Sequence, residues 1–316
     1  MFERLLVPLD GSVLAESVLP VAVTLAERLP ARITLLHVVE SDPPESVHGA
    51  RHLTRADEAE AYLAGVAERL RREAGVEVSH HVHTVAEGRV AQSIVEHSRE
   101  LGQDLVVIAT HGRGGVRGFL WGNVAQQVLG EGERPVLVVH APAGQGEEDD
   151  AVQVLQPQRW QTVVVPLDGG ERHETSLPVA AEVARRFGAR LHLVTVIPQR
   201  ADLRGSEGTL GRFFPAATQA MLEAEEQQAA AYLAVQAHHW AELAGIAVTT
   251  EVRWGEPAAQ LVEALKQQNA DLVVMASHAH RGWEAFWAGR VTPRVMAQWG
   301  RPALLVQAGP MPDRPI

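Results

Sequence analysis

An internal repeat constrains the fold of this 316-residue chain more than any other feature. When residues 4–39 are laid over residues 162–197 without a gap, roughly 16 of 36 positions are identical, far above what unrelated segments give. Both segments contain the sequence Val-Pro-Leu-Asp-Gly. A second register aligns residues 104–107 with residues 271–274. The chain is therefore predicted to hold two homologous domains.

Domain boundaries follow from the segments that the repeat leaves out. The change of register predicts an insertion in the second copy within 198–219, where three glycines and Pro215 indicate a long loop. The acidic stretch 144–150 has no hydrophobic periodicity, which is typical of a linker. The expected organisation is domain 1 over 1–142, an acidic linker over 143–159, domain 2 over 160–308, and a tail over 309–316.

Each copy alternates short aliphatic runs with segments of helical periodicity, which indicates a parallel sheet covered by helices. In the first copy the predicted strands are 5–7, 33–39, 76–85, 105–108 and 136–139, and the predicted helices are 16–29, 56–74, 90–101 and 123–129. Right-handed crossovers then give a doubly wound α/β fold. We expect two tandem, Rossmann-like, five-stranded parallel sheets with strand order 3-2-1-4-5 in each.

Composition excludes several classes of protein. There are 28 Lys and Arg against 39 Asp and Glu, a net charge of −11, which argues against a nucleic-acid-binding role. No apolar run approaches the about 20 residues of a membrane-spanning helix, and the first residues lack the features of a signal peptide. We expect a cytoplasmic protein without a membrane partner. The absence of cysteine excludes disulfides, thiolate metal sites and a Cys nucleophile.

In open parallel sheets a ligand sits at the carboxyl ends of the strands, where the strand order reverses. In the first copy this place brings Asp10 towards the glycine-rich segment 111–123, which runs into a predicted helix. Glycine amides and a helix N-terminus together favour an anion. The segment is neither a P-loop nor a G-x-G-x-x-G motif. Asp10 has a second interpretation, because Asp-Gly after a strand is also a common turn signal.

Both halves resemble universal stress protein domains in the tandem two-domain arrangement. ATP-binding members of that family carry G-x2-G-x9-G-[ST] after strand four and an Asp after strand one. Asp10 matches that Asp, and Gly112 and Gly122 match the second and third glycines. Ala109 replaces the first glycine, and Asn123 stands at the Ser or Thr position, where Asn also caps helices well.

The resemblance implies that the first domain binds ATP or a related adenine nucleotide, either alone or with Mg²⁺. The backbone of Val38 and Val39, at the end of strand two, corresponds to the family's adenine contact. The candidate nucleotide contacts are Pro8, Asp10, Val38, Val39, Ala109, His111, Gly112, Arg113, Gly122, Asn123 and Val124.

The second copy departs from the motif at the same places. Asp168 is kept, but Ala276 and Ala279 replace the first two glycines, and Arg290 follows the remaining Gly289. A Cβ restricts positive φ, and arginine is a poor N-cap. The sequence predicts weak or no nucleotide binding in domain 2, with the alternative that Arg290 itself holds an anion.

Fifteen histidines raise the question of a metal site. In a strand, His81 and His83 share one face and His80 lies on the other, and no carboxylate follows at a fixed short spacing. A solvated strand face is favoured over a zinc site, so no metal ligand is predicted. No catalytic residue is predicted either, since no G-x-S-x-G elbow or triad order accompanies His111 or His278.

The leading hypothesis is a stress-response protein that binds ATP in domain 1, with domain 2 as its structural or regulatory partner. The alternatives are an interaction scaffold without nucleotide and a slow ATPase or phosphate-transfer enzyme. The edges at 136–139 and 303–306 are expected to pair as an intrachain pseudo-dimer. A homodimer and a separate protein partner are both left open.

Overall fold

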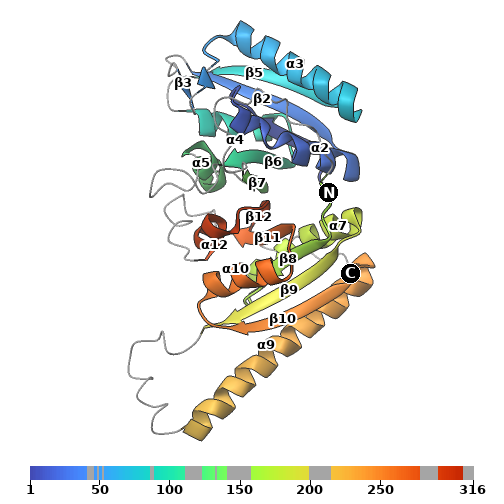
Figure 1. Cartoon of the computed structure of the whole chain (residues 1–316), viewed down its shortest axis with the longest axis vertical. Coiled ribbons are helices and arrows are strands. Elements are labelled where there is room, and N and C mark those ends of the chain that lie inside the picture. The colour runs from blue at the N-terminus through green and yellow to red at the C-terminus, as the bar shows by residue number, and fades with distance from the viewer. Residues whose placement is uncertain are drawn as a thin grey trace. The chain divides into compact units, whose positions relative to one another are not determined.

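The computed structural model describes ten segments of the chain, which are 1–40, 46–47, 50–51, 53–85, 89–110, 123–131, 134–140, 158–198, 215–277 and 291–308. Its contacts divide the chain into two compact units (Figure 1). Unit 1 comprises Met1–Arg159, His278–Ala288 and Gly300–Gln307, and unit 2 comprises Trp160–Ser277, Gly289–Trp299 and Ala308–Ile316.

Unit 1 contains the whole first repeat. Its elements are β1 (Arg4–Pro8), α1 (Val13–Glu16), α2 (Leu19–Arg28), β2 (Arg32–Glu40), β3 (Ser46–Val47), β4 (Ala50–Arg51), α3 (Ala56–Ala74), β5 (Val78–Val85), α4 (Val90–Glu100), β6 (Leu105–Thr110), α5 (Asn123–Glu131) and β7 (Val136–His140). The strands of the first repeat lie in the order β5-β2-β1-β6-β7, all parallel. This is the predicted 3-2-1-4-5 order.

The last strand of the second repeat, β12 (Ala303–Gln307), is grouped with unit 1. It runs antiparallel to β7, with Ala303 opposite Val138 and Leu305 opposite Val136. These are the two edges that the sequence predicted to pair. The pairing gives each strand a neighbour on a side that would otherwise leave its backbone groups open.

Unit 2 contains the rest of the second repeat. Its elements are β8 (Thr162–Pro166), α6 (Glu171–Glu174), α7 (Ser176–Phe187), β9 (Arg190–Ile197), α9 (Pro215–Ala244), β10 (Val248–Trp254), α10 (Pro257–Gln267), β11 (Leu272–Ser277) and α12 (Thr292–Trp299). The strand order β10-β9-β8-β11 repeats that of the first four strands of unit 1, again all parallel. The prediction of two tandem α/β domains is confirmed.

An aspartate before the fourth strand ties the strands together in both repeats. The carboxylate of Asp104 accepts hydrogen bonds from the amides of Glu3 and Arg4 at 2.9 and 3.0 Å. Asp271 accepts from the amides of Gln161 and Thr162 at 2.7 and 3.1 Å. The aspartates that define the second sequence register therefore fix the start of the first strand against the fourth.

Three local expectations need correction. The helix predicted over 16–29 begins three residues later, as α2, and residue 16 is instead the end of the separate helix α1, because Pro20 in the first turn of α2 has no amide to continue α1. The loop predicted over 198–219 is wrong from residue 215 on, because Pro215 opens α9 at a helix position that tolerates proline. No strand is predicted at 46–47 and 50–51, where the structure has the short antiparallel pair β3-β4.

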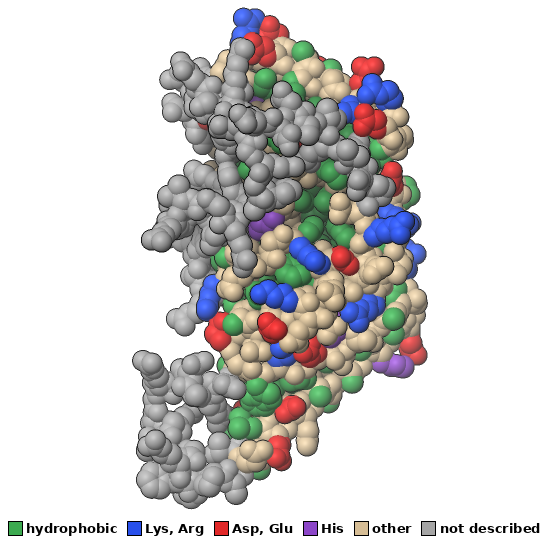
Figure 2. All heavy atoms as spheres, viewed as in Figure 1, with side chains coloured by type: hydrophobic (Ala, Val, Ile, Leu, Met, Phe, Trp, Pro, Cys, Tyr) green, Lys and Arg blue, Asp and Glu red, His purple; other side chains and the backbone are tan. Residues whose placement is uncertain are grey.

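Surface charge is mixed on the face that Figure 2 presents, where the Lys, Arg, Asp and Glu side chains of the described residues lie interspersed. Among the described residues, no helix combines the length and the apolar character that crossing a bilayer requires.

Candidate functional site

The predicted site in unit 1 lies at the carboxyl ends of β1, β2 and β6. Pro8 is the last residue of β1, and Ala109 lies in β6 opposite Val139 of β7. The side chains of Val38 and Val39 in β2 are buried, with 7% and 4% exposed. Their side chains are therefore turned into the core, and the predicted contact through their backbone atoms stays a prediction.

Asp10 organises the turn after β1. Its carboxylate accepts hydrogen bonds from the amide and the hydroxyl of Ser12, at 2.9 and 2.6 Å. The Ser12 hydroxyl oxygen in turn accepts from the amide of Ala15 at 3.1 Å and so caps α1. The turn interpretation of Asp10 therefore has direct support, and the carboxylate is held in place at the strand end.

A buried histidine that the sequence analysis missed supports the same end of β1. His37 is only 1% exposed, and its Nδ1 donates to the carbonyl oxygen of Leu9 at 2.7 Å. The equivalent Thr195 of unit 2 donates its hydroxyl to the carbonyl of Leu167 at 2.9 Å. The repeat keeps this contact with a different side chain, which is why sequence identity gave no signal for it.

Part of the predicted nucleotide site lies outside the described residues: His111, Gly112, Arg113 and Gly122. Asn123 opens α5, as predicted for the end of the glycine-rich segment, and Val124 follows in its first turn. Val124 is 36% exposed.

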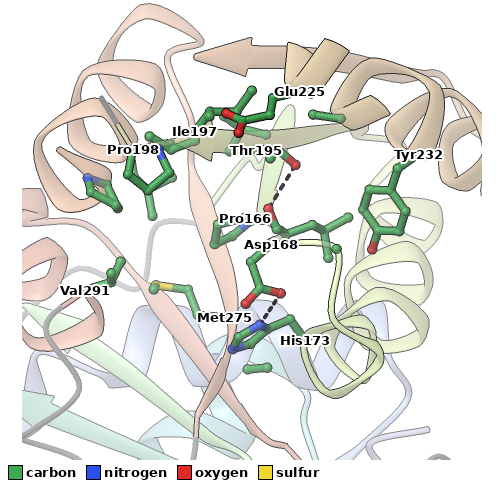
Figure 3. A pocket seen from close by; sticks show the side chains of 18 of the residues that line it. Pro166, Asp168, His173, Thr195, Ile197, Pro198, Glu225, Tyr232, Met275 and Val291 are labelled. Atoms are coloured by element: carbon green, nitrogen blue, oxygen red, sulfur yellow. Dashed lines mark hydrogen bonds and ion pairs between the residues drawn. The ribbon is translucent and has the colours of Figure 1, made fainter. Parts of the chain in front are cut away.

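Unit 2 has a cavity of about 730 Å³ at the equivalent strand ends, covered by α9 (Figure 3). Its lining is Pro166, Leu167, Asp168, Gly169, His173, Val194, Thr195, Val196, Ile197, Pro198, Glu225, Gln228, Ala229, Tyr232, Pro257, Leu261, Met275, Ala276, Val291 and Thr292. Six of these are the counterparts of predicted contacts in unit 1, namely Pro166, Asp168, Val196, Ile197, Ala276 and Val291. The fold thus forms a ligand-sized space at this place.

The carboxylate of Asp168 is turned towards His173 of α6 (Figure 3). The His173 Nδ1 lies 2.5 Å from the carboxylate, which also accepts from the amide of Gly170 at 2.9 Å. The hydrogen bond from His173 lowers the pKa of Asp168 below its ordinary value. The first repeat has Ala15 at the position of His173, so this ion pair belongs to unit 2 alone.

The only two tyrosines of the chain make the same contact in the two repeats. Tyr62 donates to Glu16 at 2.9 Å, and Tyr232 donates to Glu174 at 3.0 Å. Burial raises the pKa of both phenols, and the neighbouring carboxylate raises it further. In unit 2 this tyrosine forms part of the cavity wall.

A model of the universal stress protein family matches residues 1–140 and 159–307. This chain belongs to that family. A universal stress protein of Mycobacterium bovis is 26% identical over 298 residues, with 92% of each chain covered. A solved universal stress protein from Archaeoglobus fulgidus shares the fold, with a TM-score of 0.65 at 18% identity over 97% of this chain and 98% of that chain. A universal stress protein solved in complex with cAMP aligns with 48% of this chain and 100% of that chain, at 21% identity and a TM-score of 0.36.

In the part of the chain that the structure describes, the lining of the unit 2 cavity of this universal stress protein is acidic, which disfavours a polyphosphate. Among its described lining residues, the carboxylates of Asp168 and Glu225 are present and neither Lys nor Arg occurs. The nearby N-terminus of α10 is capped by Glu256, which accepts from the amides of Ala258 and Ala259 at 3.4 and 2.9 Å. Those amides are therefore not available to an anion.

Three histidines of unit 1 form a cluster that was not predicted from the sequence. His81 and His83 of β5 meet His97 of α4, and one ring nitrogen of each lies within 4.8 Å of the others. His80, on the opposite face as predicted, pairs with Glu60 of α3 at 2.8 Å. Burial, together with His97 and His83, lowers the pKa of His81. The residue that the sequence did not predict at this place is thus His97 of α4.

Proposed function

We propose that this universal stress protein binds ATP or a related adenine nucleotide, with or without Mg²⁺, at the strand ends of unit 1. The second repeat then serves as a structural or regulatory partner. The observation that supports the proposal best is the cavity of about 730 Å³ in unit 2. It lies at the strand ends of the second repeat, and the equivalent strand ends of the first repeat carry the proposed nucleotide site. A cavity of that size is typical of small-molecule sites.

The two repeats differ in what surrounds this place. The first keeps the spacing Gly112-x9-Gly122 before α5, whose amides and dipole favour a phosphate. The second has lost that spacing, and its described lining is acidic rather than basic. We therefore assign the nucleotide to unit 1 and expect no tight triphosphate binding in unit 2.

We propose binding with at most slow turnover. The carboxylate of Asp10 already accepts two hydrogen bonds from Ser12, so it is a poor candidate for a general base beside a γ-phosphate. An interaction scaffold without nucleotide is the competing function, and the same experiment separates the two.

Equilibrium dialysis with labelled ATP tests the proposal on the wild-type chain, Gly122→Asp and the matched variant Gly289→Asp. Wild type and Gly289→Asp are expected to bind one nucleotide per chain. Gly122→Asp is expected to lose at least about tenfold in affinity, because the added carboxylate repels the phosphates. Circular dichroism melts establish that both variants are folded.

Two outcomes would contradict the proposal. Equal binding by wild type and Gly122→Asp would place the nucleotide elsewhere, and loss of binding only in Gly289→Asp would place it in unit 2. No saturable binding by the wild type would favour the scaffold. Chromatography of the dialysed nucleotide for ADP measures turnover in the same samples.

A further inference from the structure

Two alternate residues of the edge strand and one helical residue bring three imidazoles together in unit 1. His81 and His83 lie on the same face of β5, because alternate residues of a strand do so. His97 of α4 lies against both, with ring centroids 5.0 Å from His81 and 4.3 Å from His83. The ring centroids of His81 and His83 are 6.3 Å apart. The cluster joins two elements that are separate in the sequence.

The hydrogen bonding of His97 determines which of its ring nitrogens can act as a ligand atom. His97 is only 5% exposed, and its Nδ1 lies 2.8 Å from the carbonyl oxygen of Ser93. A carbonyl only accepts, so Nδ1 carries the proton and the lone pair is on Nε2. Metal-binding histidines commonly donate their second nitrogen to a backbone carbonyl in this way, which fixes the tautomer and the ring orientation.

The second repeat has different side chains at the positions equivalent to His81 and His83. Strand register places His81 opposite Leu36 and His83 opposite Val38. The same register positions of β10 are occupied by Glu251 and Arg253.

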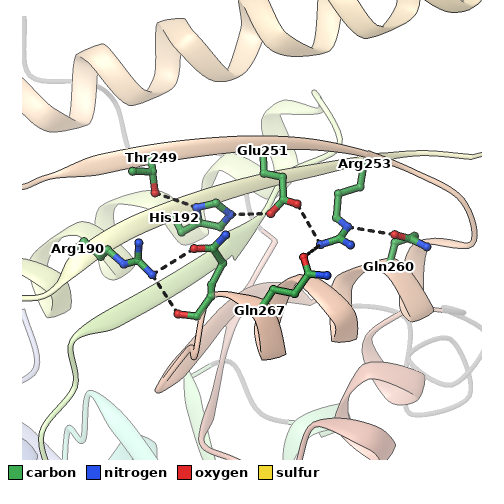
Figure 4. A network of polar contacts seen from close by, with 8 residues as sticks. Arg190, His192, Thr249, Glu251, Arg253, Gln260 and Gln267 are labelled. Atoms are coloured by element: carbon green, nitrogen blue, oxygen red, sulfur yellow. Dashed lines mark hydrogen bonds and ion pairs between the residues drawn. The ribbon is translucent and has the colours of Figure 1, made fainter.

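These two residues pair with each other at 3.0 Å in a network that includes polar side chains of α10 (Figure 4). The Arg253 guanidinium also donates to Gln260 and Gln267, each at 3.0 Å. In unit 2 opposite charges satisfy one another. In unit 1 the corresponding positions carry imidazoles, and a ring nitrogen that carries a lone pair can bind a cation.

We propose that His81, His83 and His97 bind a divalent transition-metal ion, Zn²⁺ in the first instance. Imidazole nitrogens favour Zn²⁺, Cu²⁺ and Ni²⁺ over Mg²⁺ and Ca²⁺, which prefer oxygen. In a tetrahedral site with Zn–N bonds of about 2.0–2.1 Å, the nitrogens are about 3.4 Å apart. Small rotations of the rings close the observed spacing, which is at most 4.8 Å.

The site would tie the edge strand to the helix that covers it. His81 and His83 are half-buried, so an ion has access from solvent and one coordination position is left for water. A ligand that binds only the folded chain stabilises it, so the metal is expected to raise the unfolding temperature. This inference does not depend on nucleotide binding, because none of the three histidines belongs to the proposed nucleotide site.

The experiment titrates Zn²⁺ into full-length, tag-free protein that has been stripped with a chelator, using a chromophoric competitor. The variants are His81→Gln and His83→Gln, with His80→Gln as the matched control from the same strand and the opposite face. One Zn²⁺ per chain is expected for wild type and His80→Gln. Each of the other two variants is expected to bind at least about tenfold more weakly and to lose the zinc-dependent rise in unfolding temperature.

Cobalt supplies a second, spectroscopic measurement. Visible absorption of bound Co²⁺ reports the coordination of the ion, and its spectrum is expected to be the same in wild type and His80→Gln and to be weakened or altered in His81→Gln and His83→Gln. His97→Gln is added only if its circular dichroism shows a folded chain, because that side chain is buried. Equal zinc affinity in wild type, His81→Gln and His83→Gln would overturn the proposal, as would an equal loss in His80→Gln or the absence of saturable binding.

Discussion

The carboxyl ends of the first strands of the two repeats share an aspartate, but its surroundings differ. In unit 1, Asp10 accepts hydrogen bonds from Ser12 and helps to cap α1. In unit 2, Asp168 forms an ion pair with His173 beside a cavity whose described lining is acidic. Keeping a residue at the same place in the fold has therefore not kept its electrostatic surroundings. The two repeats have therefore kept the backbone arrangement around this aspartate, while the side chains beside it have diverged.

Two side-chain contacts near these aspartates are present in both repeats. A side chain from the second strand bonds the carbonyl at the end of the first, from His37 in one repeat and Thr195 in the other. A tyrosine donates to a glutamate in both. The first contact holds a backbone carbonyl and so tolerates a change of residue type, whereas the second joins two side chains and keeps both residue types.

The largest expected difference between the repeats concerns the glutamates bound by the tyrosines. Glu16 also pairs with Arg69 at 2.6 Å, with only 18% and 17% of the two side chains exposed. Glu174 accepts instead from the neutral amide of Gln236 at 3.0 Å. Glu16→Gln leaves a largely buried arginine without its partner and is expected to cost about 2 kcal/mol in the free energy of unfolding.

Glu174→Gln, the matched change in unit 2, is expected to cost about 1 kcal/mol or less. Urea unfolding followed by circular dichroism measures both variants. Combining Glu16→Gln with Arg69→Met should recover part of the loss, since it removes the unpaired charge. Equal costs for the two glutamate variants would show that Arg69 does not distinguish the repeats.

A smaller difference is expected at the glycine after each aspartate. Gly11 has φ +87° and Gly169 has φ +83°, so alanine is strained at both positions. A Cβ on Gly11 would also lie 3.0 Å from the side chain of Leu53, whereas a Cβ on Gly169 would meet no atom of the described residues within 4 Å. Gly11→Ala is expected to cost about 2 kcal/mol and Gly169→Ala about 1 kcal/mol.

Thermal unfolding of the two glycine variants measures this difference. Adding Leu53→Ala to Gly11→Ala is expected to reduce its excess cost over Gly169→Ala, because only the steric part is relieved. If the two glycine variants have the same unfolding temperature, the contact with Leu53 does not restrict the turn between β1 and α1.

The smallest effect is the pH dependence contributed by Asp168. Its pKa is lowered by His173, so the folded chain binds fewer protons here than the unfolded chain does. The resulting stability is present above the ordinary pKa of 3.8 and is lost as the pH falls below it. The Asp168 side chain is 60% exposed, so solvent screening limits the contribution to about 0.5 kcal/mol or less.

The measurement compares the unfolding midpoint of wild type and Asp168→Asn between about pH 5 and pH 3. The variant is expected to lose less stability than wild type over this interval. His173→Ala should resemble Asp168→Asn, because either change removes the ion pair. A steeper pH dependence in Asp168→Asn than in wild type would contradict the assigned direction of the pKa shift.

Several elements were predictable because their signals are local. The helix α3 spans residues 56–74, as predicted, because apolar periodicity defines its buried face and Gly75 ends it with φ +68°. The strand order of the first repeat was also predictable, since right-handed crossovers leave few topologies for this order of strands and helices. The break between α1 and α2 was not, because the periodicity continues across Pro20 and hides the missing amide.

The candidate sites likewise have some features that the sequence predicts and others that it does not. The positions of Asp10, Val38 and Val39 at strand ends follow from the sequence, because strand ends can be read from the limits of aliphatic runs. The pairing of Asp168 with His173 and the meeting of His97 with His81 do not, because each depends on how a helix packs against the sheet.

The sequence by itself determined the duplication, the family, the doubly wound fold and the loss of the glycine spacing in the second copy. Only the tertiary structure decided that the second copy still forms a cavity, which groups surround Asp168, and that three histidines meet between β5 and α4. The physical reason is that periodicity and spacing record which face of each segment is buried. Contacts between distant side chains depend instead on the packing of whole elements, which no short stretch of sequence contains.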